Sequence, residues 1–184
     1  MDIHIVSGTH EELYDLLRDG KADLVLSDQR RAFSDLYVNY ELMQCTCCAE
    51  LSQNNPLAAG ESVTLEELKQ IPCILISSKE QQNAEQEYYE NTLGFGGSYL
   101  FAENPEEGRL LAVSNRGFLP VENVGTLPPE AVSLRRLPIF RDGRPVLRNY
   151  CAFWKKERTN GDIEEFAEML KKLINGEQNR EEKN

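Results

Sequence analysis

Three short polar segments of the sequence share a pattern that suits the binding of an anion. Each follows a predicted strand and opens a predicted helix, and the candidate residues are Ser7, Thr9, Ser77, Ser78 and Asn104. The first N–H groups of a helix are unpaired and the helix dipole is positive there, so a carboxylate, sulfate or phosphate is favoured. Open α/β sheets bind ligands at the carboxyl ends of their strands, where these residues are predicted to lie. The pattern therefore predicts a ligand site.

The same residues also fit an interpretation that involves no ligand. Thr9 with Glu12, and Ser78 with Gln81, have the spacing of capping boxes, in which side chains satisfy the first N–H groups of a helix. Asn104 stands before a proline, as an N-cap residue often does. Taken singly, each segment is more typical of an ordinary helix cap, so both interpretations stay open.

Cysteines form the second group that could do chemistry, as metal ligands or redox-active thiols. Zinc sites usually combine two pairs of cysteines, and no second pair follows Cys45, Cys47 and Cys48. Alternation along a strand would place Cys45 and Cys47 on one face and Cys48 on the other. Cys73 and Cys151 are isolated within apolar runs. We therefore expect small buried side chains and no metal or cofactor, with thiol sensing as a minor alternative.

Groups for acid–base catalysis are scarce, because His4 and His10 are the two histidines of the chain. His10 is predicted in the first turn of a helix, near Ser7, but no spacing indicates a catalytic triad. Adjacent carboxylates such as Glu66 and Glu67 point apart on a helix and face solvent. We therefore expect that the protein is not an enzyme.

Five arginines fall in one short stretch of an otherwise acidic chain: Arg135, Arg136, Arg141, Arg144 and Arg148. A solvated loop is the ordinary interpretation of such a stretch. The alternative is that these arginines steer an anionic ligand or pair with an acidic partner surface.

Composition excludes several classes of protein. The 184 residues are enough for one domain or two small lobes, and 40% hydrophobic with 28% charged residues is ordinary for a globular protein. A net charge of -11 disfavours strong binding of this chain alone to DNA or RNA. We find no apolar run long enough to cross a membrane and no signal peptide, so we expect a cytoplasmic protein. Five cysteines, an odd number, make a disulfide framework improbable.

Hydrophobic periodicity and turn residues predict an alternation of strands and helices. The first 27 residues have the pattern of a βαβ unit with parallel strands: a strand at 3–6, a helix that ends at Gly20 and a strand at 22–27. Further strands are predicted at 36–51, 73–77, 98–102, 118–121, 133–139 and 150–154. Further helices are predicted at 64–70 with a Thr64–Glu67 capping box, at 79–93 with Gly94 as its cap, from Asn104 onward, and at 162–174 with Gly176 as its stop. This order predicts an α/β fold with a mostly parallel sheet or sheets.

The order of motifs resembles the effector-binding domain of LysR-type transcriptional regulators. Four segments carry the resemblance: Gly8–Leu26, Asn55–Ala58, Thr64–Ile74 and Arg109–Pro120. In the first segment, a helix is followed by Gly20 and by Asp23 before a strand. The second, Asn55-Pro56-Leu57-Ala58, is similar to a His-Pro-Leu-Ala loop, and the fourth ends in Gly117-Phe-Leu-Pro120. Four weak motifs in the order of the family, over nearly the whole chain, are together fairly specific.

The resemblance implies a two-lobed, periplasmic-binding-protein-like (type 2) α/β fold with a ligand cleft between the lobes. By position, residues 1–47 and 149–184 would form the first lobe and residues 48–148 the second. The cleft contacts of the family would fall near Ser7–Thr9 in the first lobe, and near Ser77–Ser78 and Asn104 in the second. These are the helix starts already selected on physical grounds.

The function implied by the resemblance is effector sensing. The chain would bind a small anionic metabolite, expected to be a carboxylate, and control a DNA-bound homodimer or higher oligomer. The motifs of the winged helix-turn-helix, and of the first strand and helix of the lobe, are not found, so DNA would be bound only through a domain outside this sequence. A solute-binding protein of a transport system is the alternative, and a small α/β enzyme is the third possibility.

Overall fold

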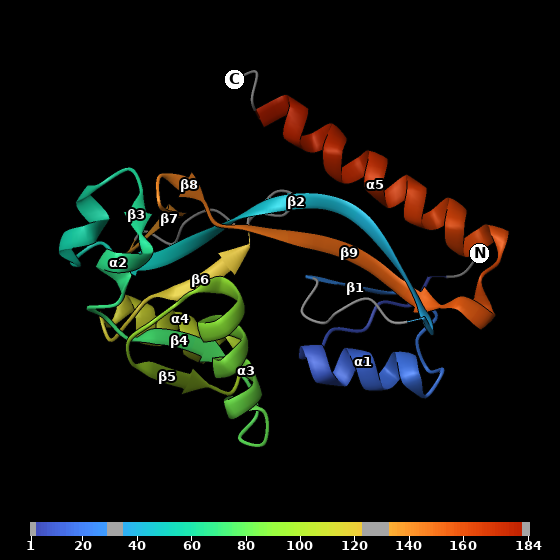
Figure 1. Cartoon of the computed structure of the whole chain (residues 1–184), viewed down its shortest axis with the longest axis horizontal. Coiled ribbons are helices and arrows are strands. Elements are labelled where there is room, and N and C mark those ends of the chain that lie inside the picture. The colour runs from blue at the N-terminus through green and yellow to red at the C-terminus, as the bar shows by residue number, and fades with distance from the viewer. Residues whose placement is uncertain (1–2, 29–34, 123–132, 182–184) are drawn as a thin grey trace. The chain divides into compact units, whose positions relative to one another are not determined.

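The computed structural model describes residues 3–28, 35–122 and 133–181, with side chains as far as residue 175 (Figure 1). The described chain divides into two compact units. Unit 1 holds residues 3–28, 35–45 and 148–181, and unit 2 holds residues 46–122 and 133–147. The predicted lobe limits, residues 1–47 with 149–184 and residues 48–148, stay a prediction.

In unit 1, a small sheet lies between two helices, α1 (His10–Arg18) and α5 (Gly161–Glu181) (Figure 1). Its strands are β1 (Val25–Asp28), β9 (Leu147–Lys155) and the first part of β2 (Tyr37–Ser52), with β9 in the middle. Successive side chains of a strand point to opposite faces. Cys151 and Phe153 therefore pack toward α1, whereas Ala152 and Trp154 pack toward α5.

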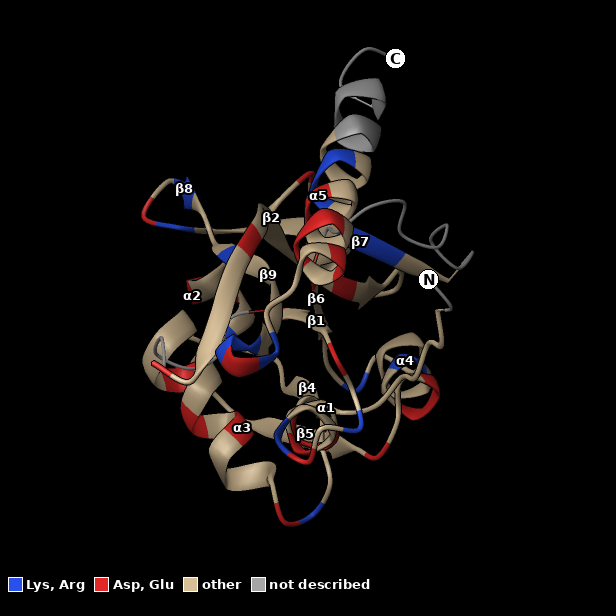
Figure 2. Ribbon diagram, turned by 90° about the vertical axis from the view of Figure 1, so that its right-hand side faces the viewer, with Lys and Arg blue, Asp and Glu red and all other residues tan. Residues whose placement is uncertain are grey.

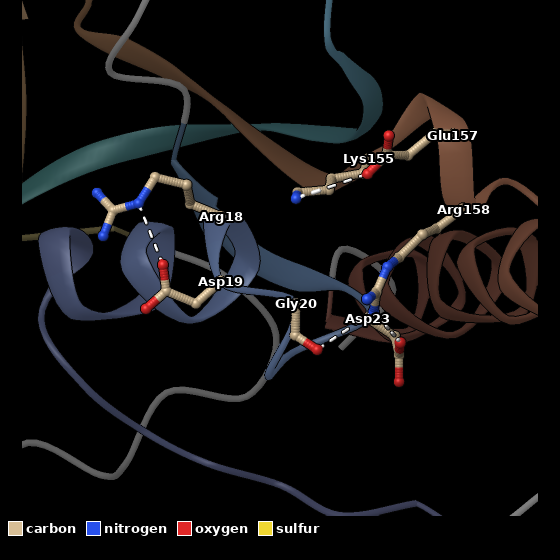
Figure 3. Close-up of polar contacts among 7 residues, drawn as sticks. All are labelled: Arg18, Asp19, Gly20, Asp23, Lys155, Glu157 and Arg158. Atoms are coloured by element: carbon tan, nitrogen blue, oxygen red, sulfur yellow. Dashed lines mark hydrogen bonds and ion pairs between the residues drawn. The ribbon is translucent and has the colours of Figure 1, made fainter.

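The turn between α1 and β1 is tied to η3 (Lys156–Arg158), the short helix that precedes α5. Arg158 Nη1 donates to the carbonyl oxygen of Gly20 at 3.2 Å and lies 3.4 Å from Asp23 Oδ1 (Figure 3). Gly20 has φ +71°, the left-handed backbone predicted for this helix stop, and a Cβ there would lie 2.5 Å from Arg158 Nη2. Glycine therefore suits this turn by its backbone conformation, and a larger residue would also require the guanidinium end of the Arg158 side chain to shift.

The predicted βαβ unit at the start of the chain is wrong. Residues 3–9 form no strand, and Ile3 and Ile5 are 56% and 88% exposed. The strand that follows α1, β1, pairs antiparallel with β9, with Val25 opposite Phe153. An apolar, β-branched run becomes a strand only where a neighbouring strand supplies backbone partners, and residues 3–6 have none in the described part of the chain.

Unit 2 contains two groups of strands. The second part of β2 pairs antiparallel with β6 (Leu119–Glu122) and β7 (Leu134–Arg141), and β7 also pairs with β3 (Val63–Thr64) and β8 (Arg144–Pro145). The other group is the parallel pair of β4 (Cys73–Ile76) and β5 (Tyr99–Ala102). The expected mostly parallel sheet is therefore wrong, since only β3–β7 and β4–β5 are parallel among the strand pairs described. Local sequence patterns indicate which segments are extended. They do not indicate which strands pair with each other or in which direction.

The helices of unit 2 are η1 (Pro56–Ala59), α2 (Leu65–Leu68), α3 (Gln82–Tyr88), the π-helical turn η2 (Tyr89–Leu93) and α4 (Pro105–Val113). Two predicted ends are confirmed. Thr64 and Glu67 form the capping box of α2, and Gly94 ends η2 in the left-handed conformation with φ +77°. Both signals are local, so the sequence was enough to find them.

The predicted end of the last helix is wrong, because α5 runs from Gly161 through Gly176 to Glu181. A glycine inside a helix costs about 1 kcal/mol relative to alanine, which weakens the helix without ending it. Glu177, Gln178 and Arg180 follow, and no proline interrupts them. The favourable propensity of these residues offsets the cost of the glycine.

Candidate functional site

The two strand ends that were predicted to open a ligand site in unit 2 lie at one edge of the sheet. Because β4 and β5 are parallel neighbours, their carboxyl ends meet, and Ser77 N donates to Ala102 O at 3.0 Å. Ser77 and Ser78 follow β4, and Asn104 follows β5 by two residues. The structure thus brings three of the five candidate residues together in unit 2.

Asn104 caps α4 as predicted. Its Oδ1 accepts from Glu107 N at 2.9 Å, and Glu107 Oε2 accepts from Glu103 N at 2.8 Å. The amide oxygen of Asn104 is therefore used by the cap, and its NH₂ group is the donor that a ligand would meet. The acidic side chains Glu106 and Glu107 in the first turn lower the attraction of this helix start for an anion.

The predicted capping box of Ser78 and Gln81 does not form. The chain first makes a turn, in which Gln81 N donates to Ser78 O at 3.0 Å, and α3 begins only at Gln82. The Ser78 hydroxyl oxygen is shielded from solvent and has no hydrogen-bond partner among the described residues. Leaving a buried hydroxyl unpaired costs about 1–3 kcal/mol. An acceptor atom of a ligand would remove this cost.

In unit 1, Thr9 begins α1 with the predicted capping box. Thr9 N donates to Glu12 Oε2 at 2.7 Å, and Glu12 N donates to Thr9 Oγ1 at 3.4 Å. Ser7 is exposed and lies in the irregular segment before the helix. Ser7 and Thr9 are thus placed next to one helix start in unit 1.

His10, the first residue of α1, belongs to a polar cluster that was not predicted from the sequence. Its Nδ1 lies 2.6 Å from Ser27 Oγ, and its Nε2 lies 3.2 Å from Asp28 Oδ1. Asp28 Oδ2 is 3.4 Å from Arg148 Nη2, and both of these side chains are 1% exposed. A buried carboxylate requires basic partners, because water no longer stabilises its charge. The signal in the sequence was the polar pair Ser27-Asp28 at the end of an apolar strand.

A second buried carboxylate lies in unit 2. Glu50 on β2 is 3% exposed and is opposite Arg136 of β7 in the strand register. Arg136 Nε donates to Glu50 Oε1 at 3.2 Å, and Arg109 Nε of α4 lies 3.6 Å from Glu50 Oε2. The expectation that the arginine-rich stretch is a solvated loop is therefore wrong for Arg136 and Arg148. Both lie on strands, and strand pairing turns them inward toward carboxylates.

All five cysteines are buried free thiols, as expected for the strand-borne set Cys45, Cys47 and Cys48. Burial raises the pKa of Cys151 to about 11. Burial also raises the pKa of Cys48, and the charge of Arg136 partly offsets this effect. Thiols that stay protonated are poor nucleophiles and poor metal ligands. In residues 3–28, 35–122 and 133–181, no group of three or more His, Cys, Asp or Glu residues is placed to hold a metal ion.

Comparison with known proteins assigns the family. Residues 1–174 match the model of the LysR substrate binding domain. The chain belongs to the LysR substrate-binding domain family. The HTH-type transcriptional regulator AceR of Acinetobacter baumannii is 27% identical over 169 residues, which cover 90% of this chain and 54% of AceR. This LysR-type domain therefore spans about half the length of that relative.

Solved structures of LysR-type regulators have the same fold. HinK from Pseudomonas aeruginosa superposes with a TM-score of 0.67 and 19% identity, covering 91% of this chain and 57% of HinK. The reduced OxyR regulatory domain from Pseudomonas aeruginosa gives 0.63 and 16%, with 90% and 78% covered. These matches confirm the α/β class and the two-lobed, periplasmic-binding-protein-like fold expected for this LysR-type domain. Among its described residues, no helix is long and apolar enough to span a membrane.

Proposed function

We propose that this domain senses a small anionic metabolite, expected to be a carboxylate, for a LysR-type transcriptional regulator. The candidate contacts are the predicted residues Ser7, Thr9, Ser77, Ser78 and Asn104. The observation that carries the proposal is the Ser78 hydroxyl oxygen, which is shielded from solvent and has no hydrogen-bond partner among the described residues. A carboxylate oxygen accepts hydrogen bonds only, so it matches a hydroxyl that lacks an acceptor.

The groups around Ser78 restrict the charge of the ligand. The Asn104 NH₂ group is a second donor at the same edge of the β4–β5 pair, whereas Glu103, Glu106 and Glu107 bring negative charge to the start of α4. Several acidic side chains beside one anion are unfavourable, and each further negative charge on the ligand adds to that cost. We therefore expect a ligand with one carboxylate rather than a phosphate or a polycarboxylate.

Unit 1 supplies groups of the same kind at the start of α1. Thr9 offers a hydroxyl, and the N-terminal turn carries the positive end of the helix dipole. His10, 30% exposed in its side chain, stands next to Thr9 and is held by Ser27 and Asp28. A protonated His10 would add a positive charge at this point.

In the longer regulator, we propose that the ligand shifts the population of conformations of a homodimer or higher oligomer that binds DNA through a winged helix-turn-helix domain. This places the protein in the cytoplasm and assigns this domain a binding role without catalysis. Membership in the LysR family supports this role over that of a transport-system solute-binding protein.

The Ser78→Ala variant tests the proposal, because stability and affinity should respond in different ways. Removing an unpaired buried hydroxyl should raise the free energy of unfolding by about 1–3 kcal/mol, the cost of leaving it unpaired. The same change should weaken binding about tenfold, since a hydrogen bond to a charged ligand is lost. Thermal shift with a panel of monocarboxylates finds the probe, and calorimetry then measures its dissociation constant.

Ser114→Ala is the matched control, because Ser114 is an exposed serine whose hydroxyl donates to Leu110 O at 2.7 Å. It should leave binding unchanged. If Ser78→Ala and Thr9→Ala both leave the affinity of the carboxylate unchanged, the site assignment is wrong. If no carboxylate raises the melting temperature, the ligand class is wrong.

A further inference from the structure

The chain that follows β5 in unit 2 carries an acidic group that the proposed carboxylate contact leaves unexplained. This group is Glu103, directly after the strand, with Glu106 and Glu107 in the first turn of α4, the red part of that helix in Figure 2. Glu103 and Glu106 are exposed, and neither takes part in an ion pair among the described residues. Arg109, one turn further along α4, faces Glu50 instead. The described residues therefore leave Glu103 and Glu106 without a basic partner.

The chain that follows β4, at the same edge, has a different character. Ser78 is followed by Lys79 and Glu80, both exposed, and their opposite charges offset each other. The Ser78 hydroxyl oxygen is shielded from solvent and has no hydrogen-bond partner among the described residues. Because β4 and β5 are parallel neighbours, their ends lie about 4.8 Å apart. A hydroxyl suited to an anion and a group of three carboxylates therefore follow adjacent strands.

A ligand that is only anionic suits one side of this edge and not the other. Its carboxylate gains a hydrogen bond from Ser78, but the acidic group repels it. A positively charged nitrogen on the same ligand reverses the sign of the second interaction. An ammonium group has three donors and no acceptor, so it matches the carboxylates of Glu103 and Glu106, which only accept. In an amino acid, one to three carbon atoms separate the two charged groups, a span comparable to the distance between adjacent strands.

We propose that the ligand is an amino carboxylate, whose carboxylate meets Ser78 and whose ammonium group lies against Glu103 and Glu106. This inference rests on the proposed function and narrows it. The anionic end of the ligand stays a carboxylate, and the acidic group selects for a positive charge at the other end. Glu107 Oε2 already accepts from Glu103 N at 2.8 Å, so its main role is to hold the chain at the start of α4. The two selecting residues are therefore Glu103 and Glu106.

Ligands that differ in one charged group are the first test. Propionate and β-alanine share their carbon chain and carboxylate, and β-alanine adds the ammonium group. β-Alaninamide keeps the ammonium group and lacks the carboxylate. In NMR titrations of the 184-residue chain, β-alanine should bind about tenfold more tightly than propionate, because each exposed ion pair contributes a factor of about two to five. β-Alaninamide should bind at least tenfold more weakly than β-alanine, because it offers Ser78 no charged acceptor.

Removal of the selecting charges is the second test. Glu103→Gln/Glu106→Gln should reduce the preference for β-alanine over propionate to about twofold or less, without weakening the binding of propionate. The matched control is Glu61→Gln/Glu66→Gln, which removes two exposed negative charges elsewhere in unit 2 and should leave the preference unchanged. Added salt should also reduce the preference in the parent chain, because exposed ion pairs are screened.

The outcomes separate this inference from the proposed function on which it rests. If propionate binds as tightly as β-alanine, the amino carboxylate is wrong and carboxylate sensing stands. A preference that survives in Glu103→Gln/Glu106→Gln also overturns the inference, because the selecting residues then lie elsewhere. If β-alaninamide binds as tightly as β-alanine, the carboxylate contact itself is wrong. If none of the three probes binds saturably, the proposed carboxylate site fails, and the inference fails with it.

Discussion

The two units stabilise their interiors in different ways. Unit 2 has one large apolar cluster, which includes Leu51, Leu75 and Ile139, and a second, smaller cluster around Ile74 and Leu119. Unit 1 has a small cluster on each face of its sheet and depends on polar ties between distant segments, such as Arg158 with Gly20. A smaller core leaves less apolar burial to offset conformational entropy. Unit 1 is therefore the part in which a single substitution should matter most.

Among the residues that the structure describes, each unit also buries one carboxylate, and the partners of the two differ. Glu50 in unit 2 lies beside two arginines, Arg136 and Arg109, which are charged at every relevant pH. Asp28 in unit 1 lies beside Arg148 and His10, and His10 is charged only when it is protonated. The charge balance around Asp28 thus depends on the protonation of His10, whereas the charge balance around Glu50 involves two arginines.

Removing one arginine from each cluster tests this difference and gives the largest expected effect. Arg148→Met should reduce the free energy of unfolding by about 3–5 kcal/mol, because it leaves the charge of Asp28 buried beside His10. Arg136→Met should cost about 1–3 kcal/mol, because Glu50 keeps Arg109 and Arg136 itself is 13% exposed. Chemical denaturation of both variants measures these losses.

The charge state of His10 provides a second test of the electrostatic explanation. Protonation of His10 would place a positive charge beside Asp28, so the loss in Arg148→Met should shrink when the pH is lowered, whereas the loss in Arg136→Met should stay the same. Asp28→Asn/Arg148→Met should regain much of the stability, since the uncompensated charge is gone. If the double variant is no more stable than Arg148→Met, packing rather than charge explains the loss.

Substitution of alanine for either of two glycines should cause a smaller loss of stability. Comparing the two losses distinguishes the cost of a left-handed backbone from the cost of steric crowding. Gly20 in unit 1 and Gly143 in unit 2 have φ values of +71° and +73°, but a Cβ at Gly143 would meet nothing within 4 Å. Gly143→Ala should cost about 1 kcal/mol for the left-handed backbone. Gly20→Ala should cost about 1 kcal/mol more, since Arg158 has to move. Equal losses in thermal denaturation would mean that Arg158 gives way freely.

The smallest effect is expected for thiol chemistry at neutral pH, in both units. Cys151 and Cys48 are buried with raised pKa values, so a thiol reagent should label the native chain slowly and the unfolded chain at once. Because burial raises the pKa of Cys151 from 9.0 to about 11, stability should fall as pH rises through this range. Cys151→Ala should remove that part of the pH dependence. Rapid labelling of the native chain would revive the thiol-sensing alternative.

Local features of the fold could be predicted from the sequence, and features that depend on a distant partner could not. The caps at Thr9, Thr64 and Asn104 are confirmed, because each depends on residues within one turn. The prediction of a strand at residues 3–6 is wrong, because a strand forms only beside another strand that supplies hydrogen-bond partners. The Ser78–Gln81 box fits the spacing rule, but a turn moves the start of the helix.

The candidate site shows the same limit. Local pattern placed His10 in the first turn of α1, which is confirmed. Its contacts with Ser27 and Asp28, and the burial of Arg148, come from segments far apart in the sequence. The sequence alone does not show which of the five arginines are buried. Their burial depends on the strands beside them, and these strands come from distant parts of the sequence.

The chain has a single tryptophan, Trp154, which packs against α5 in unit 1 and whose indole N–H donates to Thr159 Oγ1 at 3.1 Å. Its fluorescence is therefore an intrinsic reporter of unit 1 alone. Tyrosine absorption responds to both units, because the tyrosines are Tyr88, Tyr89 and Tyr99 in unit 2 and Tyr14, Tyr37, Tyr40 and Tyr150 in unit 1. A change in tryptophan emission that comes before or after the change in the combined tyrosine signal therefore shows, in one unlabelled sample, which unit unfolds first.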